Sequence, residues 1–79
     1  MMDKNISMDK MKVGQSALIV SFTDELMSLK LLEMGCVPGE LVILERKAPL
    51  GDPISISVSG YLLSLRIDEA CTVIVAIQD

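Results

Sequence analysis

The side chains that could carry chemistry in this sequence are few and scattered. Histidine is absent, and the two cysteines, Cys36 and Cys71, lie far apart in the chain. Nucleophilic catalysis needs a base beside the serine or thiol, and general acid–base catalysis at neutral pH usually recruits histidine or a carboxylate with a shifted pKa. The standard catalytic triads are therefore excluded, and we expect a protein that is not an enzyme.

Metal or thiol chemistry is also disfavoured by position. Cys36 follows the expected end of a helix, where the helix dipole disfavours a thiolate, and the cysteine spacing matches neither a CxxC pair nor a Cys/His metal site. Glu40 with Glu45, and Asp68 with Glu69, could offer oxygen ligands to a divalent ion, but isolated carboxylates on turns and strand ends are mostly solvated. We expect the thiols to be small buried or half-buried residues, with no metal site and no cofactor.

Charge and composition exclude several kinds of partner. The net charge of −4 repels phosphate backbones, and Phe22 and Tyr61 are the only aromatic side chains on which bases could stack. Neither GxxxxGK[ST] nor GxGxxG occurs, so the chain is not expected to bind nucleotide itself. Its apolar runs are far shorter than the roughly 18 to 20 residues that span a bilayer. We expect a cytoplasmic protein without nucleic-acid binding or direct membrane insertion, which reaches the inner face of the membrane only through a partner.

The elements that must position these side chains form one small domain. Residues 1–10 are polar and lack periodicity, which predicts a flexible N-terminal lead-in, although Ile6 and Met8 could pack back onto the domain at 11–79. Five segments have the apolar pattern of short strands, at residues 17–22, 41–47, 54–59, 61–66 and 71–77, and residues 67–70 are expected to form one helical turn. Five strands with one helix inserted after the first predict a mainly β fold, a small sheet bent into a partial barrel.

The inserted helix is predicted over residues 24–34. Thr23 is the candidate N-cap, and Gly35 ends the helix because glycine adopts the left-handed backbone at no steric cost.

This helix has two apolar faces. Met27, Leu31 and Met34 form the stripe expected to face the core, whereas Leu29 and Leu32 point to the opposite side. The second face is either covered by the N-terminal segment, simply exposed, or offered to another molecule.

Three segments of the sequence resemble the FeoA family, the small SH3-like cytosolic component of bacterial ferrous iron transport. They are Met-Gly-Cys-Val-Pro-Gly at 34–39, Ala-Pro-Leu-Gly-Asp-Pro at 48–53, and Leu-Ser-Leu-Arg at 63–66 followed by Glu69-Ala70. Their order and spacing across residues 11–77 make the resemblance specific. Met34 stands where the family has leucine, and Lys30 stands where many relatives carry arginine.

The resemblance implies an SH3-like barrel and a non-enzymatic accessory protein that acts with FeoB, the membrane ferrous iron transporter with a cytosolic guanine-nucleotide-binding domain. The partner surface that we expect is the second helix stripe, Leu29 and Leu32, together with the turn Leu50, Gly51 and Asp52 if that turn folds beside the stripe. The turn contains Pro49 in the second position of a type I turn, so its shape is fixed before binding. A second copy of the chain could use the same patch, which makes a homo-oligomer possible.

The alternative is a stand-alone regulatory domain that resembles the SH3-like module of iron-dependent repressors. A direct iron carrier is the weakest interpretation, because the chain lacks histidine and any cluster of ligands. Neither arginine, Arg46 or Arg66, stands in an obvious finger-like loop, so we assign no role in nucleotide hydrolysis. The barrel does not by itself imply proline-rich ligands, because grooves for such segments are lined by aromatic residues.

Overall fold

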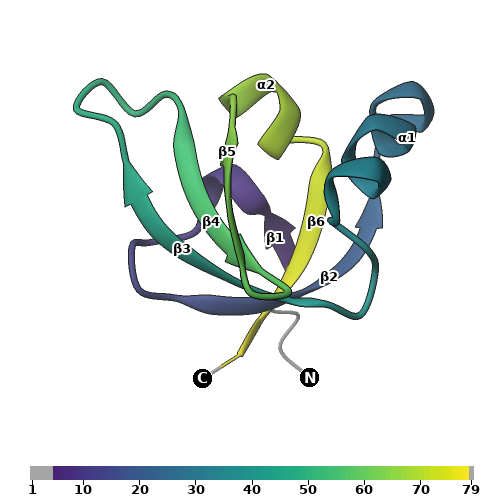
Figure 1. Cartoon of the computed structure of the whole chain (residues 1–79), viewed down its shortest axis with the longest axis horizontal. Helices are drawn as coiled ribbons and strands as arrows, with labels where there is room; N and C mark the ends of the chain where they lie inside the picture. Colours follow the sequence, from purple (N-terminus) through teal and green to yellow (C-terminus); the bar gives the residue numbers. More distant parts are fainter. Residues whose placement is uncertain (1–4, 79) are drawn as a thin grey trace.

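The computed structural model of the protein describes residues 5–78, which form a single antiparallel sheet of six strands in the order β1-β6-β2-β3-β4-β5. The strands are β1 (Asn5–Ser7), β2 (Ser16–Phe22), β3 (Leu41–Lys47), β4 (Ile54–Val58), β5 (Tyr61–Leu65) and β6 (Val73–Gln78). Helix α1 (Glu25–Met34) follows β2, the short helix α2 (Ile67–Ala70) follows β5, and a 3-10 turn η1 (Met8–Lys10) follows β1. Figure 1 shows both α-helices at the end of the curved sheet where the β3–β4 turn also lies.

The sheet bends because two of its strand pairs are irregular. The pairing of β2 with β6 shifts register between Ile19 and Ser21, and the pairing of β3 with β4 shifts between Leu44 and Arg46. Such bulges increase the local twist and bend the strand. The edge strands β1 and β5 remain unpaired with each other within residues 5–78. The predicted mainly β partial barrel with an inserted helix is confirmed.

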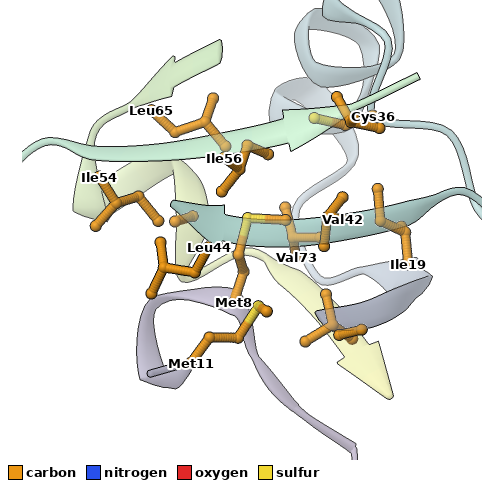
Figure 2. Packing of buried hydrophobic residues seen from close by; sticks show 14 of the residues in the cluster. Met8, Met11, Ile19, Cys36, Val42, Leu44, Ile54, Ile56, Leu65 and Val73 are labelled. Atoms are coloured by element: carbon orange, nitrogen blue, oxygen red, sulfur yellow. The ribbon is translucent and has the colours of Figure 1, made fainter. Parts of the chain in front are cut away.

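The core lies inside this bent sheet and is almost entirely aliphatic. Ile54, Ile56 and Val58 are buried, as the alternation along that segment predicted. Figure 2 shows Ile54 and Ile56 facing Met8 and Met11, which enter the same cluster from the N-terminal segment. The remaining members include Ala17, Ile19, Leu31, Cys36, Val42, Leu44, Leu65, Ala70, Val73 and Val75.

The N-terminal segment differs from the lead-in expected over residues 1–10. Strand β1 pairs with β6, with Ile6 opposite Val75, and both Met8 and Met11 are completely buried. The prediction that the fold begins near Met11 with five strands is therefore wrong for residues 5–10, while residues 1–4 lie outside the described residues. A strand of three residues is too short to show periodicity, and β6, which holds it in place, lies at the other end of the chain.

Helix α1 begins one residue later than predicted. Asp24 is its N-cap, with the carboxylate Oδ1 accepting a hydrogen bond from the backbone N–H of Met27 at 2.9 Å. Thr23 instead donates its backbone N–H to the carbonyl of Thr72 at 2.8 Å, which joins it to the chain before β6. Both residue types are good caps, so the tertiary contact of Thr23 decides between them. Gly35 ends the helix as predicted, with φ of 104°.

The burial of Met8 makes a prediction about stability. Met8→Ala is expected to lower the free energy of unfolding by about 2–5 kcal/mol, comparable to Leu31→Ala, because each change leaves a cavity in the core. Leu50→Ala is the control, since Leu50 is 97% exposed and its truncation should change stability by less than about 0.5 kcal/mol. Denaturant unfolding measures all three. A Met8→Ala variant as stable as the control would show that the N-terminal segment does not belong to the core.

Candidate functional site

The predicted helix stripe is exposed. Leu29 and Leu32 on α1 are 61% and 39% exposed, and Leu26, which the sequence analysis did not single out, joins them at 82%. The opposite face of α1 packs inward through Leu31, which is fully buried. One explanation left open for the second face was that Met8 covers it. That explanation is wrong, because Met8 lies in the barrel core.

The turn at Leu50, Gly51 and Asp52 is closed by a hydrogen bond, but its neighbour is not the one expected. The backbone N–H of Gly51 donates to the carbonyl of Ala48 at 2.7 Å, which closes the turn. The Asp52 Oδ1 accepts the backbone N–H of Ile67 at 3.1 Å, so the turn is attached to the start of α2. In Figure 1 the turn and α1 lie on opposite sides of α2. The structure therefore does not bring the turn beside Leu29 and Leu32; they form two separate surfaces.

A hollow of about 540 Å³ opens between α1, α2, the β3–β4 turn and the end of β5. Its lining residues are Lys30, Met34, Asp52, Pro53, Ser64, Arg66 and Glu69. Each of the three segments that carry the family resemblance contributes to it, through Met34, through Asp52-Pro53, and through Arg66 with Glu69. The resemblance rests on these segments, but that they meet at one place was not predicted. The one feature of the sequence that could have indicated this is that all three segments carry the same family resemblance.

Glu69 is the best-connected polar side chain of this hollow. Its Oε1 accepts the backbone N–H of Arg66 at 2.8 Å, which caps α2, and its Oε2 pairs with the ammonium group of Lys30 on α1. The side chain is nevertheless buried, with 7% of the residue exposed. The expectation that Asp68 and Glu69 are solvated holds for Asp68, which is exposed, and is wrong for Glu69.

The surroundings of Glu69 keep it charged. The hydrogen bond from Lys30 and then the one from the backbone of Arg66 lower the pKa of the Glu69 carboxyl, and the nearby Arg66 charge acts in the same direction. Desolvation acts against them, but the net pKa shift is downward. At neutral pH the lining of the hollow therefore includes the charged Glu69 carboxylate and two cationic side chains, Lys30 and Arg66.

The cysteines show two different environments. Cys36 is fully buried, and burial raises the pKa of its thiol, which agrees with the expected structural role. Cys71 is exposed, contrary to expectation, and its Sγ donates to the carbonyl of Asp68 at 3.4 Å. Across residues 5–78, no three cysteine or acidic side chains lie close enough together to hold a metal ion. In the same part of the chain, no helix has the length and apolarity needed to span a membrane.

A strongly bent antiparallel sheet, with a helix inserted after β2 and a helical turn before the last strand, defines a small SH3-like domain. The FeoA domain model matches residues 6–77, and the chain belongs to the FeoA family, which is associated with ferrous iron transport. Among curated protein sequences, none matches the chain.

Solved structures agree with this assignment. The FeoA-like protein from Clostridium acetobutylicum is 33% identical, with a TM-score of 0.91 over 99% of this chain and 92% of that one. FeoA of Stenotrophomonas maltophilia, a procaryotic SH3 domain protein complexed with zinc, is 31% identical, with a TM-score of 0.77 over 89% of this chain and 88% of that one. A manganese-dependent transcriptional repressor is 11% identical, with a TM-score of 0.86 over 99% of this chain and 44% of that one, and shares the fold alone.

The lowered pKa of Glu69 predicts a pH-dependent contribution to stability. Because the folded-state pKa lies below the ordinary value of 4.5, the carboxylate stabilises the folded protein above that pH, and the contribution is lost as pH falls through the folded-state pKa. Glu69→Ala should cost about 1–2 kcal/mol at pH 7, and Glu69→Gln less, because its amide oxygen can still cap α2. Thermal or denaturant unfolding between pH 7 and pH 3 measures both.

The control for this series is Glu45→Gln on β3, an exposed carboxylate whose removal should change stability by less than about 0.5 kcal/mol at any of these pH values. If the free energy of unfolding of wild type and of Glu69→Gln differed by the same amount from pH 7 to pH 3, this would contradict the electrostatic role of Glu69.

Proposed function

We propose that this protein is a non-enzymatic accessory component of bacterial ferrous iron uptake, which acts by contact with the cytosolic part of a FeoB-type ferrous iron transporter. Membership of the FeoA family supports this proposal. So does the relative from Stenotrophomonas maltophilia, which has been suggested to act as a bacterial ferrous iron transport activating factor. In this proposal the protein works in the cytoplasm and reaches the inner face of the membrane through the transporter.

The observation that carries the proposal is the exposed face of α1. Leu26, Leu29 and Leu32 lie on the side of α1 away from the buried Leu31, and Glu25 and Glu33, four residues before and after Leu29, lie on the same side. Exposed leucines gathered on one helix face among charged residues are typical of a protein–protein interface. The helix is fixed at its start by the Asp24 cap and at its end by Gly35, so little order has to be gained on binding.

The turn at Leu50, Gly51 and Asp52 is proposed as a second, separate contact with the same partner. Leu50 projects from the closed turn, and the bond from Ile67 to Asp52 holds the turn against α2. A leucine presented on an already ordered turn can enter a pocket of the partner at low entropic cost. A second copy of the chain could also use the face of α1, and it would then compete with the transporter.

The alternative function is a regulatory module like that of metal-dependent repressors. The similarity of this fold to the manganese-dependent repressor favours it. The two sequences are only 11% identical, however, and the similarity covers 44% of the repressor chain. The module would then act with a helix-turn-helix protein in place of a transporter. Using such a protein as a second bait in the experiment below separates the two proposals.

The test is a pull-down with the cytosolic part of the FeoB-type transporter from the same genome. Leu29→Glu/Leu32→Glu should bind at least about tenfold more weakly than wild type, because each leucine is replaced by a charge at the centre of the patch. Leu29→Glu alone has a matched control in Val13→Glu, since the two positions are 61% and 59% exposed. Circular dichroism and thermal unfolding verify that each variant is folded. Undiminished binding by a folded double variant would remove the face of α1 from the proposal.

A further prediction concerns iron. The purified protein is expected to show no submicromolar one-to-one Fe²⁺ site, because residues 5–78 bring together no set of three cysteine or acidic ligands. It is also expected to show no nucleotide hydrolysis on its own, because the sequence contains neither GxxxxGK[ST] nor GxGxxG. Anaerobic calorimetry and a phosphate-release assay measure these. A tight stoichiometric Fe²⁺ site would favour a direct iron carrier.

A further inference from the structure

Strand β5 has a free backbone edge. It joins β4 through the turn Ser59-Gly60, where both residues have positive φ, 52° and 82°, as in two-residue hairpins that begin with a hydrogen-bonded pair. Because bonded and non-bonded pairs alternate in antiparallel strands, Tyr61, Leu63 and Leu65 bond to β4. The N–H and C=O groups of Leu62 and Ser64 therefore point away from β4, and no other described strand pairs with them.

The hollow described above opens at this same edge. Ser64 and Arg66 form one side of it, and Lys30 of α1 stands on another. The guanidinium group of Arg66 makes no hydrogen bond or ion pair with any residue between 5 and 78, and it is exposed.

The carboxylates of the hollow are already engaged. Both oxygens of Glu69 accept hydrogen bonds, one from the backbone of Arg66 and one from Lys30, and Oδ1 of Asp52 is bonded to α2. Arg66 and the remaining N–H groups of Lys30 are therefore free to bind an incoming anion. Arginine and lysine bind carboxylates through short, charge-assisted hydrogen bonds.

We propose that an extended acidic segment of a partner protein adds to β5 as a further antiparallel strand and places a carboxylate in the hollow against Arg66 and Lys30. Main-chain hydrogen bonds to Leu62 and Ser64 would supply the pairing, as in other cases of strand addition. Side chains two positions apart share a face of a strand, so Leu62, Ser64 and Arg66 point the same way. An apolar residue of the segment then lies opposite Leu62, and an acidic residue four positions earlier in the segment lies opposite Arg66.

A second copy of the chain fits this edge less well. Residues 61–65 carry no carboxylate, and a symmetric pairing of two β5 strands, with Leu62 opposite the second copy's Ser64, would place Arg66 opposite Gly60. The second copy would then place no carboxylate opposite Arg66. The net charge of −4 does not exclude an acidic segment, because at physiological salt charges act over about 8 Å and the contact residues dominate. This surface is independent of the leucine face of α1.

The test uses a synthetic peptide, acetyl-Glu-Thr-Thr-Thr-Val-Thr-amide, and the same peptide with Gln in place of Glu. In a nuclear magnetic resonance titration of the intact protein at physiological salt, the backbone amide signals of Leu62 and Ser64 should shift saturably with the Glu peptide. The Gln peptide should bind at least about threefold more weakly, because it lacks the charge. This comparison needs no protein variant.

Variants locate the charge. Arg66→Gln should weaken binding of the Glu peptide by about threefold or more and remove the difference in affinity between the two peptides. Arg66→Lys should retain part of that difference in affinity. Arg46→Gln is the matched control, because Arg46 is the other arginine of the chain and lies on β3.

Three results would overturn the proposal. They are the absence of shifts at Leu62 and Ser64 at millimolar peptide, equal binding of both peptides, and an equal effect of Arg46→Gln and Arg66→Gln. Shifts at Leu62 that depend on protein concentration without peptide would assign the edge to a second copy instead.

Discussion

The bonds of the Glu69 carboxylate join the two helices of this domain. One oxygen caps α2 through the backbone of Arg66, and the other holds Lys30 of α1. A buried carboxylate is costly unless it is paired and hydrogen-bonded, so the positions of Lys30 and Arg66 are constrained together. The hollow between α1, α2 and β5 has its shape because these groups are held around one charge. Asp52 adds the β3–β4 turn to the same arrangement through Ile67.

This arrangement divides the surface of a very small protein into two kinds of contact. The outer face of α1 is apolar, with Leu26, Leu29 and Leu32 exposed, and it suits a partner that buries hydrophobic area. Lys30 and Met34 of the same helix line the polar hollow beside the free edge of β5. A partner could therefore engage both surfaces of α1 at the same time. The two proposals can be separated by mutation, because binding at the outer face of α1 depends on the leucines and binding at the edge of β5 depends on Arg66.

Periodicity predicted most of the fold, because the strands that build the core show it clearly. Residues 54–59 alternate, and Gly35 marks the end of α1 by the backbone conformation that it permits. Strand β1 could not be predicted, since three residues have no period and their pairing depends on β6. The role of Glu69 was also hidden, because its partner Lys30 lies on another helix and no local pattern connects them. Helix geometry placed Leu29 and Leu32 opposite the core stripe but left their exposure open, and the separation of the turn from them required the arrangement of α2.

The most direct test of the central role of Glu69 is a double-mutant cycle with Lys30→Met and Glu69→Gln, measured by denaturant unfolding at pH 7 and low salt. If the pair joins α1 to α2, the two changes should be non-additive, with a coupling free energy of about 0.5–1 kcal/mol that decreases at high salt. Strict additivity, with coupling below about 0.3 kcal/mol at both salt concentrations, would show that the two helices are held independently and would contradict this account.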